Sequence, residues 1–137
     1  MTTTVESEII EALSAHLSTM ADVWPIAFEN VDPGSLTNTR HLRTQHIPGP
    51  PRSYTLGRGF AQFIGIFQIT VVVEKGIGAI LPNTEVSKIV QHFERMGTIS
   101  CPSGLITITE RPASAGGLDG GATYDTPISI RYELIAN

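Results

Sequence analysis

Apolar side chains at the start of the chain follow the spacing of an α-helix. They recur at every third or fourth position, at Val5, Ile9, Leu13, Leu17 and Met20. Because residues three or four apart share one face of a helix, this stripe predicts a helix that packs against a core. We expect it to end near residue 21, since Pro25 disfavours helix at the residue before it, and a short strand to follow at residues 26–28.

The next segment, residues 39–56, is polar and then rich in proline. It carries basic and imidazole side chains at Arg40, His41, Arg43, His46 and Arg52. We expect a strand over its first half, followed by a stiff loop at Pro48-Gly49-Pro50-Pro51. Proline fixes the backbone and lacks an amide donor, so this loop is typical of a sheet edge or a presented surface.

A long strand is predicted from Phe60 to Val73. Its odd positions are all apolar, as expected of a face in the core: Ala61, Phe63, Gly65, Phe67, Ile69, Val71 and Val73. Its even positions mix large apolar and polar side chains: Phe60, Gln62, Ile64, Ile66, Gln68, Thr70 and Val72. Such a strand would extend about 46 Å, so we expect part of it to project from its domain or to bend at Gly65. The mixed face needs a partner that accepts both kinds of side chain.

A second helix and two strands are expected in the remaining sequence. The helix stripe comprises Val86, Ile89, Val90 and Phe93, with Asn83 or Thr84 as the cap and Gly97 as a left-handed end. One strand lies in 104–111, with Ile106 and Ile108 on one face, and the last strand alternates over 123–134. The glycine-rich residues 112–122 between them are expected to form a loop.

These elements follow the order α-β-β-β-α-β-β. They predict an α+β (mixed α/β) fold, in which two helices cover one face of a twisted mixed sheet of about five strands. The long strand and the strand at 104–111 are joined through a helix, so they are expected to run parallel. The length of 137 residues is that of one compact domain, which we place at residues 1–137.

Composition narrows the classes of partner. The chain has 16% charged residues and a net charge of −4, with no basic cluster, which argues against a sequence-specific nucleic-acid surface. The few charges leave apolar surface for another protein to cover. The first residues lack a secretion signal and no run is long enough for a membrane helix, so we expect a protein made in the cytoplasm without a membrane partner.

Catalytic and cofactor motifs are not found in the sequence. There is no G-x-S-x-G elbow, and Ser103 and Cys101 have no activating partner nearby in the sequence, so Cys101 is interpreted as a packing residue. Asp119 and Asp125 flank the glycine-rich loop and are interpreted as solvated rather than as a hydrolase pair. The G-x-G pairs complete no phosphate-binding motif. We therefore expect that the protein is not an enzyme and binds no cofactor.

Four histidines lack the spacing of a metal site: His16, His41, His46 and His92. His41 and His46 lie five residues apart on a strand and are expected to point to opposite faces. His16 and His92 are interpreted as polar positions on the two helices. A metal site shared across a subunit interface remains open as an alternative.

Three stretches of the sequence resemble the lambda-type phage tail terminator family over most of the chain. They are a Leu-Arg strand before a Pro-Gly-Pro turn (Leu42-Arg43, Pro48-Gly49-Pro50), a Gly-Ile-Phe-Gln strand (residues 65–68), and an Asp-Gly-Gly loop before the last strand (residues 119–121). The resemblance implies a non-enzymatic protein of the siphophage neck. Such a protein forms a homo-hexameric ring on the major tail tube protein, ends tube growth and joins the head-side connector. It works in the virion after assembly in the host cytoplasm, and DNA passes through its lumen.

The residues expected at the assembly interface come from the stiff loop and the mixed face. They are His46, Pro48, Pro50, Arg52, Phe60, Ile64 and Ile66. Three alternatives remain open: another neck component such as a head-closure protein, a small hydrolase on a similar scaffold, and a monomer whose long strand is bent and covered by its own chain.

Overall fold

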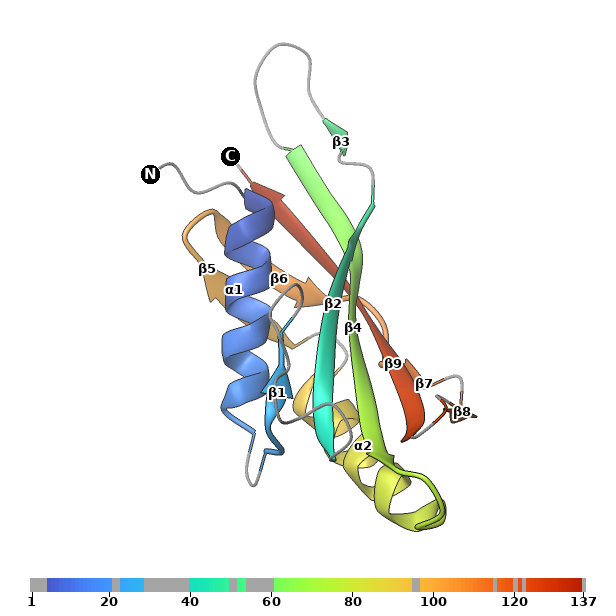
Figure 1. The fold of residues 1–137 in the computed structure, drawn as a ribbon. Helices are drawn as coiled ribbons and strands as arrows, with labels where there is room; N and C mark the ends of the chain where they lie inside the picture. Colours follow the sequence, from blue (N-terminus) through green and yellow to red (C-terminus); the bar gives the residue numbers. More distant parts are fainter. Residues whose placement is uncertain are drawn as a thin grey trace.

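The computed structural model describes residues 5–20, 23–28, 40–49, 52–53, 61–94, 97–114, 116–119, 121 and 123–136. Two helices and nine strands lie in these ranges (Figure 1). The helices are α1 (Val5–Ser18) and α2 (Ile80–His92). The strands are β1 (Ile26–Ala27), β2 (His41–Pro48), β3 (Arg52–Ser53), β4 (Ala61–Glu74), β5 (Thr98–Cys101), β6 (Gly104–Ile108), β7 (Ala113–Ser114), β8 (Leu118–Asp119) and β9 (Thr123–Ala136).

The strands form one mixed sheet in the order β1-β2-β4-β9-β6-β5. β3 pairs with β4, and both β7 and β8 pair with β9. Only β1 and β2 pair in parallel among the described strands. The α+β class, the mixed sheet and the two helices are therefore confirmed. The sheet has more strands than expected because β3, β5, β7 and β8 are short.

β4 and β9 form the centre of the sheet. All 14 residues of β4 pair with β9, from Ala61 opposite Ala136 to Glu74 opposite Thr123. The expectation that the long strand projects from its domain is therefore wrong, since an equally long strand of the same chain lies beside it. β6 also runs antiparallel to β9, so β4 and β6 run in the same direction, as expected, but with β9 between them.

The hydrophobic core lies between the sheet and both helices. The odd positions of β4 from Phe67 to Val73 are buried, as the alternation predicts. They pack with Ile9, Leu13 and Leu17 of α1, Ile89 of α2, Phe93 just after it, Ile106 and Ile108 of β6, and Ile128, Ile130, Tyr132 and Leu134 of β9. Cys101 packs against this cluster, which confirms its interpretation as a packing residue. The opposite face of the sheet carries neither helix.

The start of α2 differs from the prediction. The helix begins at Ile80 after Ala79, which makes no side-chain cap, so neither Asn83 nor Thr84 is the N-cap. Pro82 does not prevent this earlier start, because the first turn of a helix has no intrahelical partners for its amides. Gly97 does not have the left-handed conformation expected of a helix end, since it is not among the glycines with positive φ.

The glycine-rich segment is more ordered than expected. Within its described residues it contains β7 and β8, and both pair with β9. The prediction of a plain loop over residues 112–122 is therefore wrong for these two strands. A two-residue strand has no alternation that could reveal it in the sequence.

Candidate assembly interface

The face of the sheet opposite the helices, here called the open face, carries the mixed positions of β4. In the register of the sheet, Ile66 lies between Ile47 of β2 and Arg131 of β9. Ile64 lies one row further along, opposite Glu133. The two isoleucines that alternation places outside the core therefore lie beside a third isoleucine from another strand.

These side chains surround a hollow of about 320 Å³. Its apolar part is formed by Ile47, Pro48, Ile64 and Ile66. Gly65 and Gly49 also line it, and the amide of Gly49 donates to the carbonyl of Ile64 over 2.8 Å. Three of the seven residues predicted for the interface, Pro48, Ile64 and Ile66, thus lie together at one hollow.

Further apolar side chains lie exposed on the same half of the open face. Ile47 is 40% exposed, and Leu105 of β6 is 54% exposed. Ile135 is exposed as well and pairs with Gln62 of β4. Because Ile106 pairs with Leu134, Leu105 comes alongside Ile135. This half of the face leaves several large aliphatic groups in contact with water.

Charged and polar groups border the hollow on the β9 side. Gln62 Nε2 donates a hydrogen bond of 2.8 Å to Glu133 Oε1. Arg131 forms an ion pair of 3.6 Å with Glu110. Both members of that pair are exposed, so the ion pair contributes little to stability and can rearrange when another surface arrives. An apolar centre with a polar border is the usual anatomy of a protein interface.

Beneath the hollow, Gly65 makes room for a buried tyrosine on the core side of the sheet. A Cβ atom at Gly65 would lie 2.6 Å from the Tyr132 hydroxyl and 2.8 Å from the Ile47 carbonyl oxygen. His46 Nε2 forms a hydrogen bond with the same hydroxyl, and the two rings stack with centroids 5.6 Å apart. Burial, and then the negative charge of Glu6, raise the pKa of Tyr132 to about 12.

His46 therefore belongs to the support of the hollow rather than to its surface. It alternates with Ile47 along β2 and points to the helix side, whereas His41 lies on the open face, as their five-residue spacing predicts. A role of His46 at the interface stays a prediction, and it would be indirect, through the hydrogen bond to Tyr132.

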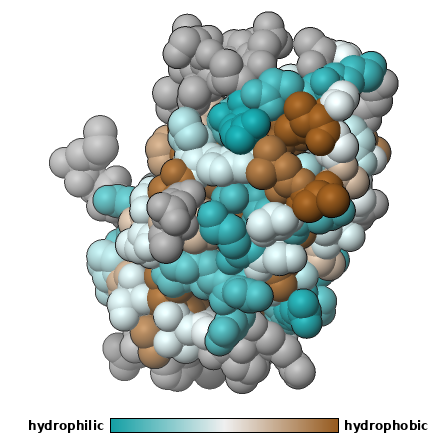
Figure 2. Space-filling model, turned by 90° about the horizontal axis from the view of Figure 1, so that it is seen from below, coloured by the Kyte–Doolittle hydropathy of each residue, from teal (hydrophilic) through white to brown (hydrophobic). Residues whose placement is uncertain are grey.

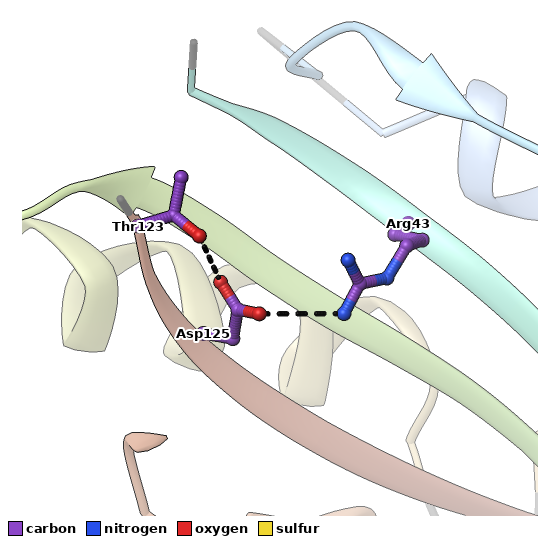
Figure 3. A network of polar contacts seen from close by, with 3 residues as sticks. All are labelled: Arg43, Thr123 and Asp125. Atoms are coloured by element: carbon purple, nitrogen blue, oxygen red, sulfur yellow. Dashed lines mark hydrogen bonds and ion pairs between the residues drawn. The ribbon is translucent and has the colours of Figure 1, made fainter. Parts of the chain in front are cut away.

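The other half of the open face is more buried, and polar side chains bridge its strands. Thr70 and Val72 of β4 are buried there, although the alternation predicted a mixed and partly open face. Arg43 of β2 reaches across β4 to Asp125 of β9, with 3.4 Å between Nη2 and Oδ2 (Figure 3). Thr123 donates a further bond of 2.9 Å to Asp125 (Figure 3). Among the described residues of this face, the half around Ile64 and Ile66 is therefore the more open to a partner.

The side chains of three predicted interface residues, Pro50, Arg52 and Phe60, are not described. Pro50 and Phe60 lie outside the described residues. Arg52 is described in its backbone, which pairs with Gln62 as part of β3. Its strand therefore extends the sheet next to the hollow.

Two polar clusters were not predicted from the sequence patterns. His16 and His92 stack with ring centroids 4.2 Å apart, and the Nε2 atom of each lies within hydrogen-bond distance of the other's backbone carbonyl, at 2.9 and 2.6 Å. They tie together the ends of α1 and α2. Glu85 of α2 is buried, with one carboxylate oxygen unpaired and the other 3.4 Å from Lys88. Burial raises the pKa of Glu85, while the Lys88 charge opposes that shift.

Within the described ranges, no group of three or more His, Cys, Asp or Glu side chains is arranged to hold a metal ion. Among the same residues, no helix has both the length and the apolar character needed to cross a membrane.

Comparisons with known proteins agree with this fold. A solved chain of no stated function is 19% identical, over 95% of this chain and 92% of its own length, with a TM-score of 0.72. A chain from the virion of a native gene transfer agent particle is 12% identical, over 98% of this chain and 100% of its own, also with a TM-score of 0.72. At these identities the likeness shows the fold alone. No curated protein sequence matches the chain.

Family membership comes from the sequence itself. The model of the phage tail terminator protein family matches residues 8–132, which is most of the chain. This match confirms the resemblance noted from the Pro-Gly-Pro, Gly-Ile-Phe-Gln and Asp-Gly-Gly stretches. The chain belongs to the phage tail terminator family, a family of structural proteins of the phage tail.

Proposed function

We propose that the chain forms a closed ring that caps the tail tube, stops its growth and presents a surface to the head-side connector. The observation that carries this proposal is the apolar hollow on the open face of the sheet. Ile47, Ile64 and Ile66 gather there from two strands, on the face that carries neither α1 nor α2. Clustered apolar groups that a monomer leaves exposed are typical of protein contact surfaces.

The hollow and its border combine apolar and charged side chains, which suits a subunit that is made free and assembles afterwards. The polar border of Glu110, Arg131 and Glu133 keeps the free subunit soluble, while the isoleucines supply the apolar area that is buried on contact. An aliphatic side chain transferred fully out of water contributes about 1.5–3 kcal/mol. Ile64 and Ile66 are already partly buried in the single subunit, so the three groups gain less than this and offset only part of the cost of association. A tube end that gathers the subunits side by side would lower the rest of that cost.

The resemblance adds the stoichiometry and the partners. It implies six copies in the ring, the major tail tube protein on one side and a head-side neck protein on the other. The related fold of a chain in a gene transfer agent virion is consistent with work inside a particle. The net charge of −4 would disfavour tight binding of the DNA that passes through the lumen.

The direct test is electron microscopy of negatively stained tubes. A self-polymerising tail tube protein is mixed with the purified chain, and the length and the ends of the tubes are scored. We expect shortened tubes with added density at one end. Tubes of unlimited length with bare ends would contradict the proposal, and binding to DNA-filled heads instead would identify a head-closure component.

Variants locate the surface. Ile64→Asp and Ile66→Asp each place a charge in a contact that must lose water, so both should abolish capping. The matched control is Ile10→Asp on α1, which makes the same change at an exposed isoleucine on the helix side. All three variants should keep the wild-type circular dichroism spectrum. If the Ile64 and Ile66 variants cap tubes as well as the control does, the open face is not the interface.

A further inference from the structure

A second apolar feature lies at the opposite end of β4, in the turn that leads to α2. Ile77 is 42% exposed and Ile80 is 85% exposed, the latter at the first position of the helix. Gly76 and Gly78 flank Ile77 with φ values of 93° and 91°. A Cβ atom added at either glycine would meet no atom within 4 Å, so the turn stands clear of the rest of the described structure.

The two isoleucines form a convex apolar tip. Figure 2 looks at the end of the molecule that carries this turn, and shows hydrophobic side chains gathered in a patch among hydrophilic ones. Neither Ile77 nor Ile80 belongs to the hydrophobic core cluster. Their exposure calls for a partner surface that is concave and apolar.

The charges of the tip and of the hollow are complementary. The first turn of α2 contains no acidic residue, so the positive end of its helix dipole is not neutralised there. The hollow has the opposite balance, with Glu110 and Glu133 against the single Arg131. The N-terminal end of α2 at the tip would be attracted to this rim.

One chain cannot bring its own tip to its own hollow. Ile66 and Glu74 lie eight residues apart on the same continuous strand, which corresponds to about 26 Å. The hollow lies near one end of this rigid strand and the tip follows the other. The tip can therefore reach a hollow only on a second copy. Because the two surfaces differ, the contact would be head to tail, the kind that closes into a ring when the rotation between copies allows it.

We propose that Ile77 and Ile80 of each subunit insert into the hollow of Ile47, Ile64 and Ile66 on the next subunit. This contact rests on the proposed ring and names the two surfaces that build it. Gly76 and Gly78 give the turn positive φ angles that other residues rarely adopt, and this turn presents Ile77 at the tip. The contact repeats around the ring, so every tip and every hollow is used.

Cross-linking distinguishes this contact from all symmetric ones. In a Cys101→Ala background, which removes the single native cysteine, one variant carries Ile80→Cys and another carries Ile66→Cys. Both are bound to tail tube ends and treated with a short bismaleimide reagent. We expect a covalent dimer when the two variants are mixed and none when either is used alone. A dimer from one variant alone would indicate a two-fold contact and would overturn the proposal.

Loss of the tip supplies an independent test. Ile80→Asp changes an exposed position, so it should fold normally yet fail to form rings, whereas Ile80→Val should form them. If the Cys101→Ala parent caps tubes but the mixed variants give no dimer, the ring function stands and this contact is wrong. If the wild-type chain itself does not cap tubes, the proposed function fails, and absence of the mixed dimer in concentrated protein then rejects the contact too.

Discussion

Substitution of Gly65 by alanine tests the link between the core and the hollow. A Cβ atom at this position would lie 2.6 Å from the Tyr132 hydroxyl, 2.9 Å from Tyr132 Cζ and 2.8 Å from the Ile47 carbonyl oxygen. Ordinary contacts are about 3.5–4.0 Å, so the neighbours must move by more than half an ångström. The carbonyl oxygen belongs to β2, which pairs with β4 at this point, so it cannot move without straining that pairing.

The expected cost follows from these contacts. Overpacking of this kind costs about 1–3 kcal/mol. Replacing glycine restricts the unfolded chain and returns about 0.5–1 kcal/mol. We therefore expect Gly65→Ala to lower the free energy of unfolding by about 1–2 kcal/mol. Urea unfolding followed by the fluorescence of Trp24, which packs against the core, measures this change.

A second substitution controls for a general loss of strand stability. Tyr132→Phe removes the hydroxyl that approaches closest, but leaves the Ile47 carbonyl in place. The double variant should therefore lose less stability than the sum of the two single variants, with a coupling of at least about 0.5 kcal/mol. Strict additivity, or a Gly65→Ala variant as stable as the wild type, would refute the close packing of Tyr132 against this glycine.

Three further changes probe the polar clusters. Glu85→Gln should raise the free energy of unfolding at pH 7 by about 1 kcal/mol. Burial raises the pKa of Glu85 above 4.5, so the stability that this group contributes below pH 4.5 is lost in the wild type as the pH rises. Melting temperatures of both proteins at pH 4 and pH 7 check this, and a variant that melts below the wild type at pH 7 would contradict it. Tyr132→Phe should remove an absorbance titration centred at about pH 12, and the wild type should lose the contribution of this phenol between pH 10.0 and 12. Arg43→Ala should lower the free energy of unfolding in urea by at most about 1 kcal/mol, because the Arg43 side chain that pairs with Asp125 is half exposed. A larger decrease would contradict this and would show that Arg43 shields Val72 from water.

Alternation along the sequence predicted the central strands well because it depends on one strand at a time. The odd positions of β4 and the even positions of β9 are set by burial alone, and both patterns match the observed core. The helix stripes succeeded for the same reason. The start of α2 failed because Thr84 was expected to cap the helix, whereas its hydroxyl donates to the Ile80 carbonyl within the first turn.

The sequence predicted Pro48, Ile64 and Ile66 of the candidate site, but not the residue that joins them. The mixed face of β4 pointed to Ile64 and Ile66, but no local pattern shows that Ile47 comes beside them. That neighbour depends on the register between β2 and β4, which long-range pairing determines. The stacked pair of His16 and His92 was missed for the same reason, since 76 residues separate the two. Contacts of this kind follow from the tertiary fold and not from periodicity.

Gly65 explains why a hollow forms on a strand whose neighbouring positions are large. A side chain at this position would compete with Tyr132 for space on the helix side of β4. Without one, Tyr132 packs against the strand itself, held by His46, and the two flanking isoleucines are fixed on the opposite side. The core and the proposed contact surface therefore share one residue. A change that loosens the core at Gly65 should weaken ring formation even when Ile64 and Ile66 are unchanged.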